Sequence, residues 1–91
     1  MGNKRKQIEP ECIERVVRDL GLKLEYRLNQ KGYGTLASNH EILGVIREEL
    51  TEYEAAIHSR ASDEEKIEEL KDIAVAAIFG IASIQSGGVD W

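Results

Sequence analysis

The chain has 91 residues, a formal net charge of −5 and a single cysteine, Cys12. A chain of this length forms one small domain, which buries only about 60% of its unfolded surface. One cysteine excludes an internal disulfide and is typical of a reduced, cytoplasmic protein. With 17 acids against 12 bases, nucleic acid is not expected as the main partner, because binding to a phosphate backbone requires a basic surface.

The first predicted element is a helix at about residues 10–29, preceded by a tail at residues 1–9 that we expect to be disordered. Pro10 suits the first turn of a helix, and the turn signal at residues 31–34, which contains two glycines, follows the helix. Between these signals apolar residues recur at helical spacing. They are Ile13, Val16, Val17, Leu20, Leu24 and Leu28.

The second predicted helix spans about residues 39–59. Ser38 and Glu41 have the spacing of a capping box, in which each side chain accepts a hydrogen bond from the other residue's free backbone N–H. An apolar stripe at helical spacing then predicts the buried face. It comprises Ile42, Val45, Ile46, Leu50, Tyr53 and Ile57.

The third predicted helix spans about residues 63–86 and begins at a second capping box, formed by Ser62 and Glu65. The link at residues 59–61 is short, so the second and third helices should be antiparallel neighbours. Residues 73–84 are apolar on every side, and such a helix has to be covered all round. We therefore expect an all-α single domain of three helices, completed as a helical bundle by assembly into a homodimer or homotetramer.

No membrane partner is expected. The longest uncharged run, Ile73–Val89, is shorter than the roughly 18 residues that a membrane span needs, and it contains serines and glycines. The N-terminus also lacks the apolar stretch of a secretory signal. The run is therefore interpreted as a buried helix of a cytoplasmic protein.

Four acidic residues lie on helix faces that should be buried. Glu49 and Glu52 border the apolar stripe of the second helix, and Glu69 and Asp72 share one face of the third helix just before its apolar segment, residues 73–84. An acid in such a position is costly unless it is paired or binds a cation. Four converging carboxylates repel one another, and a hard divalent cation relieves that repulsion. The residues therefore predict a metal site, while the alternative is that they solvate two helix faces.

The same acids belong to a two-part motif, Glu48-Glu49-Leu50-Thr51-Glu52 followed by Glu69-Leu70-Lys71-Asp72. This motif resembles the EExxE and ExxD signature of MazG-like nucleoside triphosphate pyrophosphohydrolases, in their short bacterial and phage form. The resemblance covers about residues 32–84. It implies an all-α enzyme that uses Mg²⁺ (or Mn²⁺) to hydrolyse a nucleoside triphosphate to a monophosphate and pyrophosphate. By that resemblance Glu48 is a supporting catalytic acid, and the metal ligands are Glu49, Glu52, Glu69 and Asp72.

The chain departs from many members of that family after Asp72, where it is apolar and lacks basic residues that would contact phosphates. Phosphate contacts would then come from Lys23, Arg27 or Lys31, or from a partner subunit. Two alternatives stay open. One is a phosphoribosyl-ATP pyrophosphohydrolase, which shares the metal chemistry. The other is a non-catalytic helical dimer that binds nucleotide or metal, or serves as an interaction module.

Overall fold

The computed structural model describes residues 5–91, and within them the chain forms three helices and no strand. They are α1 (Pro10–Lys31), α2 (Asn39–His58) and α3 (Asp63–Gln85). The predicted all-α class is confirmed, and the predicted helix bounds differ from these by one or two residues. Of the predicted disordered tail, residues 1–4 lie outside the described part, and residues 5–9 are irregular. Over the described residues, every helix is too short or too polar to cross a membrane.

The local start and stop signals act where the sequence predicts them. Pro10 is the first residue of α1, and Gly32 ends this helix with a φ of 87°, a value that favours glycine. Before α2, the Ser38 hydroxyl accepts a hydrogen bond from the Glu41 N–H at 3.0 Å. The Glu41 carboxylate, however, accepts from the N–H of Ala37 at 2.6 Å, one residue earlier than the predicted capping box requires. The Glu41 side chain therefore satisfies a donor of the incoming loop.

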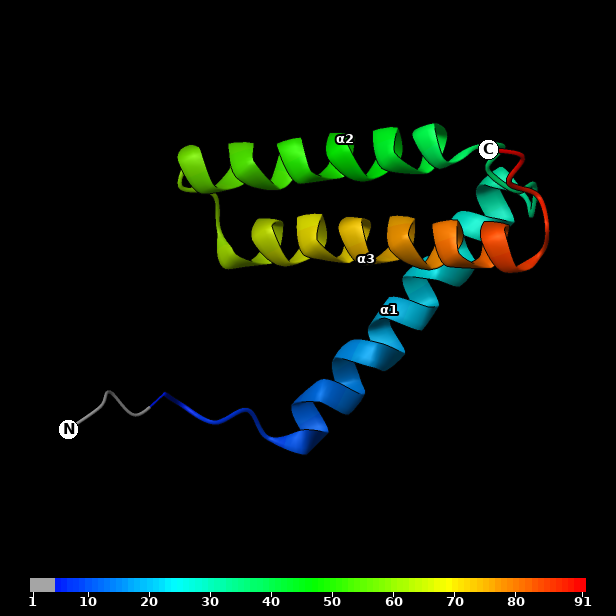
Figure 1. Cartoon of the computed structure of the whole chain (residues 1–91). Coiled ribbons are helices and arrows are strands. Elements are labelled where there is room, and N and C mark those ends of the chain that lie inside the picture. Colours follow the sequence, from blue (N-terminus) through cyan, green and yellow to red (C-terminus); the bar gives the residue numbers. More distant parts are fainter. Residues whose placement is uncertain (1–4) are drawn as a thin grey trace.

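The helices α2 and α3 form an antiparallel hairpin, as predicted, while α1 crosses α3 obliquely and its N-terminal half extends away from the hairpin (Figure 1). The hairpin is closely packed at Gly80. A Cβ atom at this position would lie 2.8 Å from Cγ2 of Ile42, a distance that real Cβ contacts do not show. Glycine at this position therefore allows α3 to approach α2.

The segment after α3 folds back onto the loop that precedes α2. The Asp90 N–H donates to the carbonyl of Ala37 at 2.8 Å, and the Asn39 N–H donates to the carbonyl of Trp91 at 2.6 Å. The ring of Trp91 lies against His40, with centroids 5.3 Å apart. These contacts hold the beginning of α2 next to the end of α3.

The core of the single chain is small. Its buried hydrophobic residues, within the part that the structure describes, are Ala56, Val75 and Ala76. The predicted stripe of α2 is partly wrong, because Leu50 and Ile57 are 46% and 49% exposed. The reason is that α2 is rotated so that another set of residues faces α3. They are Ile42, Glu49, Glu52 and Ala56.

Candidate metal centre

Four carboxylates converge in the seam between α2 and α3. Glu49 and Glu52 come from α2, and Glu69 and Asp72 come from α3. In each helix the two acids are three residues apart and therefore share one face. One carboxylate oxygen from each residue lies within 4.8 Å of those of the other three. The structure thus brings together the four residues that the sequence singles out, and we name them the acidic quartet.

Two oxygens of the acidic quartet are buried without a hydrogen-bond donor. They are Oε2 of Glu49 and Oε2 of Glu69. A buried acceptor without a donor costs about 1–3 kcal/mol, and more when it is charged. A cation between the carboxylates would satisfy both oxygens at once. These two oxygens without donors are the structural evidence that the four residues fit a bound metal.

Two carboxyl groups of the quartet, those of Glu49 and Glu69, have a raised pKa. Burial, followed by the negative charge of Glu52, raises the pKa of Glu49 above its usual value. The pKa of Glu69 is raised for the same two reasons in the same order. Both groups therefore resist ionisation while no cation is present. An all-oxygen ligand set of this kind suits a hard cation such as Mg²⁺ or Mn²⁺.

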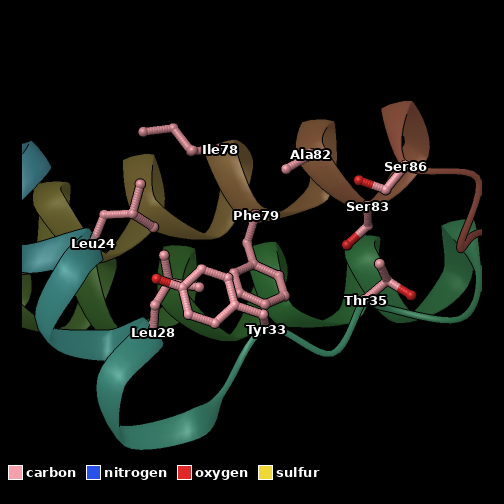
Figure 2. A pocket seen from close by; sticks show the side chains of 9 residues that line it. All are labelled: Leu24, Leu28, Tyr33, Thr35, Ile78, Phe79, Ala82, Ser83 and Ser86. Carbon is pink, nitrogen blue, oxygen red and sulfur yellow. The ribbon is translucent and has the colours of Figure 1, made fainter.

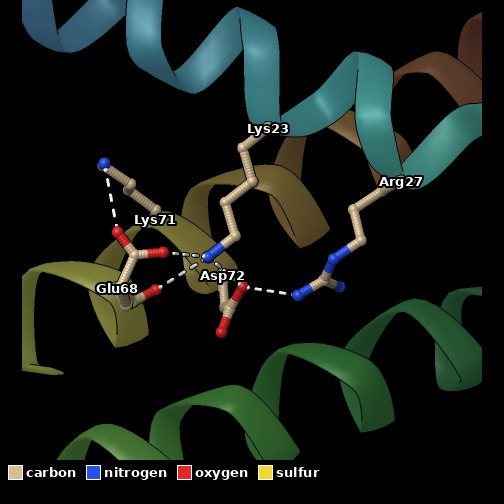
Figure 3. A network of polar contacts seen from close by, with 5 residues as sticks. All are labelled: Lys23, Arg27, Glu68, Lys71 and Asp72. Carbon is tan, nitrogen blue, oxygen red and sulfur yellow. Dashed lines mark hydrogen bonds and ion pairs between the residues drawn. The ribbon is translucent and has the colours of Figure 1, made fainter.

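Asp72 also belongs to an ion-pair network with α1 (Figure 3). Its Oδ1 lies 2.8 Å from Nζ of Lys23 and 2.7 Å from Nη2 of Arg27. Lys23 contacts Oε1 of Glu68 as well, at 2.9 Å, and Lys71 contacts the other oxygen of Glu68 at 3.2 Å. Lys23 and Arg27, predicted as phosphate contacts, are therefore engaged with acids of α3.

The network shifts the pKa of two of its members. Burial alone would lower the pKa of Lys23, but the hydrogen bonds with Asp72 and Glu68 outweigh it, so the pKa is raised. The hydrogen bond from Lys23, followed by that from Lys71, lowers the pKa of Glu68. Both shifts favour the charged forms. Glu68, although its side chain is 54% exposed, is thus part of the attachment of α1.

The remaining predicted site residues, Lys31 and Glu48, are exposed. Lys31 lines a cavity of about 150 Å³ that also touches Glu49 and Asp72. The rest of its lining is mainly apolar, and includes Leu36, Val45, Val75 and Phe79. Glu48 is not one of the four converging residues. Lys31 thus lies beside the acidic quartet, whereas Glu48 has no contact that assigns it a role there.

A second cavity, of about 220 Å³, lies between the end of α1, the following loop and the C-terminal part of α3 (Figure 2). Its walls include leucine side chains of α1, Tyr33 of the loop, and Ile78 and Phe79 of α3. The Ser83 hydroxyl at its edge is already used, because it accepts a hydrogen bond from the Leu36 N–H at 2.9 Å. The lining contains no charged residue, so this cavity offers little chemistry and is a gap in the packing of α1 on α3.

Sequence reasoning missed that Lys23 and Arg27 hold Asp72. A signal was nevertheless available. The two bases are four residues apart on one face of α1, and Glu68 and Asp72 are four residues apart on one face of α3. Matching charge pairs of this kind indicate two helices that lie in contact.

Comparisons with protein-family models, with curated proteins and with solved structures gave no match to this chain. Its function is therefore inferred from the site geometry and from the motif.

Proposed function

We propose that the protein is a Mg²⁺-dependent nucleoside triphosphate pyrophosphohydrolase of the MazG-like type. The observation that carries this proposal is the convergence of the four motif acids, within 4.8 Å of one another, in the seam of the hairpin. Acids placed only for solubility would point outward, where water solvates them. Here two of the carboxylate oxygens are buried and have no donor, which favours a cation-binding role.

The acidic quartet would hold the metal, which in such sites neutralises phosphate charge and activates water. A further cavity next to Glu52 and Glu69 is also lined by three other acids, Glu64, Glu65 and Glu68. Such a concentration of negative charge attracts cations. The cavity beside Glu49 and Asp72 offers room for part of a substrate, with Lys31 exposed at its lining as a candidate phosphate contact.

Assembly into a homodimer is part of the proposal. Ile13, Val16 and Val17 form one stripe on α1 and are 50%, 48% and 62% exposed in the single chain. On α3, Ile81 and Ile84 are exposed as well. A second copy would bury such surfaces and could also supply phosphate contacts.

The direct test is pyrophosphate release from a panel of ribo- and deoxyribonucleoside triphosphates, with Mg²⁺ or Mn²⁺. We expect turnover of at least one nucleotide, and a loss greater than about 100-fold in Glu52→Gln and Asp72→Asn, beyond the effect typical of residues around a metal site. Glu54→Gln is the matched control, because Glu54 is an exposed acid of the same helix. Absence of turnover across the panel would contradict the enzyme proposal.

A non-catalytic nucleotide or metal binder is the second candidate, and one observation favours it. Lys23 and Arg27 are bound to Asp72, so neither is poised for a phosphate. Calorimetry with Mn²⁺ and each nucleotide separates the two candidates. Binding of both ligands without release of pyrophosphate is the result that only the second candidate predicts.

A further inference from the structure

We propose that Arg27 and Lys23 are positioning residues, which hold Asp72 in place for a divalent cation and so make the docking of α1 and cation binding depend on each other. This inference rests on the metal site of the proposed function. It extends the site to α1, a helix that contributes none of the four carboxylates.

The geometry at Asp72 separates its two oxygens. Lys23 and Arg27 both contact Oδ1, at 2.8 and 2.7 Å. The second oxygen points away from them toward α2 (Figure 3), the helix that carries Glu49 and Glu52. One oxygen of the carboxylate is therefore fixed by α1, while the other is directed to the seam. Groups that fix a metal-binding carboxylate in this way orient it and tune the affinity of the site.

The contacts are also shielded enough to matter. The side chain of Asp72 is only 13% exposed and that of Lys23 is 18% exposed. Ion pairs on an open surface are worth little, whereas removing one partner of a shielded pair leaves a costly charge. Without Lys23 and Arg27, the Asp72 carboxylate would thus be free to turn to other orientations.

The charges point to one cation per site. When ionised, the quartet and Glu68 together carry five negative charges, and the three bases paired with Asp72 and Glu68 offset three of them; these bases are Lys23, Arg27 and Lys71. The remaining two are balanced by a single divalent ion. Without the two cations of α1, the four carboxylates would repel one another more strongly and would spread apart.

Asp72 pairs with α1 and would also bind the cation. The coupling between the docking of α1 and cation binding therefore has to work in both directions. A docked α1 favours the cation, and a bound cation, by fixing Asp72, favours the docked α1. Apart from the ion pairs, α1 meets α3 through Leu24 and Leu28 around the loosely packed cavity of Figure 2. This weak apolar contact leaves the ion pairs a large share of the attachment.

Titration calorimetry with Mn²⁺ tests the proposal on the full chain. We expect Arg27→Met to bind Mn²⁺ about 10–100-fold more weakly than the parent, and Arg27→Lys, which keeps the charge, to recover part of the loss. Arg18→Met removes a charge from an exposed position of the same helix and should bind like the parent. If the parent binds Mn²⁺ but Arg27→Met equals Arg18→Met, or binds more tightly, the inference is overturned and the metal site stands. A parent that binds no Mn²⁺ overturns both.

Hydrogen exchange on the unaltered protein tests the coupling without relying on a variant that folds. Addition of Mn²⁺ should slow exchange of α1 amides around residues 23–27, because the bound cation fixes Asp72 and with it the docked α1. Exchange in α1 that does not respond to saturating Mn²⁺ would overturn the mutual dependence.

Discussion

At the scale of single residues, the acidic quartet gathers one exposed acid, Glu52, and three half-buried acids in a way that the free chain tolerates poorly. Glu49 and Glu69 each place one oxygen where no donor reaches it. Their raised pKa values have the same origin, since burial and the charge of Glu52 both disfavour the ionised form. The protein therefore gives up stability at this place, as proteins commonly do at functional sites.

This cost predicts an unusual dependence of stability on pH in the metal-free protein. A carboxyl group with a raised pKa binds its proton more tightly in the folded state, so its contribution to the free energy of unfolding is lost as the pH rises above 4.5, the ordinary value. Glu68, with its lowered pKa, acts in the opposite direction. In thermal unfolding without divalent cations, Glu49→Gln should match the parent at acidic pH and melt at a higher temperature than the parent at neutral pH.

Mg²⁺ should reverse that order, because it stabilises the folded parent and has a weaker site in the variant. Glu54→Gln, at an exposed position of α2, should follow the parent under all these conditions. Equal melting curves of the parent and Glu49→Gln at neutral pH would show that the quartet carries no such strain.

At the scale of elements, the helices were predictable and their seam was not. Pro10, Ser38, Ser62 and Gly32 are strong local signals, and each acts at the helix end where it was expected. The buried face of α2 was harder to predict, because apolar residues such as Leu50 and Ile57 outnumber the small residues that make the contact. Which face of α2 is buried depends on its close packing against Gly80 of α3. That packing involves two helices and cannot be read from the sequence of α2 alone.

Two glycine substitutions test that packing. Alanine at either Gly80 or Gly44 gains about 1 kcal/mol of helix propensity. Only at Gly80 does the added Cβ meet another side chain, 2.8 Å from Ile42, whereas nothing lies within 4 Å at Gly44. Gly44→Ala should therefore exceed Gly80→Ala in free energy of unfolding by about 1–3 kcal/mol, the usual cost of overpacking. Denaturant titration measures the difference, and a Gly80→Ala protein as stable as Gly44→Ala would argue against this seam.

At the scale of the whole molecule, the single chain leaves much of its apolar surface uncovered. The convergence of the quartet could be predicted from two i,i+3 acid pairs on helices joined by a short link. The attachment of α1 could not be predicted from its apolar stripe, because Ile13, Val16 and Val17 of that stripe are exposed in the single chain. The sequence signal for this attachment was the matching charge pairs of α1 and α3. The stripe is consistent with a partner that a single sequence does not specify.

The homodimer is testable by sedimentation equilibrium. We expect the parent to have twice the mass of the chain, and Val17→Asp, at a position 62% exposed in the single chain, to shift the protein to monomer. Arg15→Asp introduces the same side chain at an exposed polar position of α1 and should leave the mass unchanged. A monomeric parent whose melting temperature is independent of concentration would contradict the assembly.

The central claim is that one divalent cation binds between the four carboxylates of α2 and α3. Crystals soaked with Mn²⁺ and a non-hydrolysable nucleoside triphosphate, measured for anomalous scattering, test it most directly. The account predicts a Mn²⁺ peak bounded by Glu49, Glu52, Glu69 and Asp72, with the phosphates of the nucleotide beside it. A map in which Mn²⁺ and nucleotide bind elsewhere, and the quartet remains without a metal peak, would contradict it.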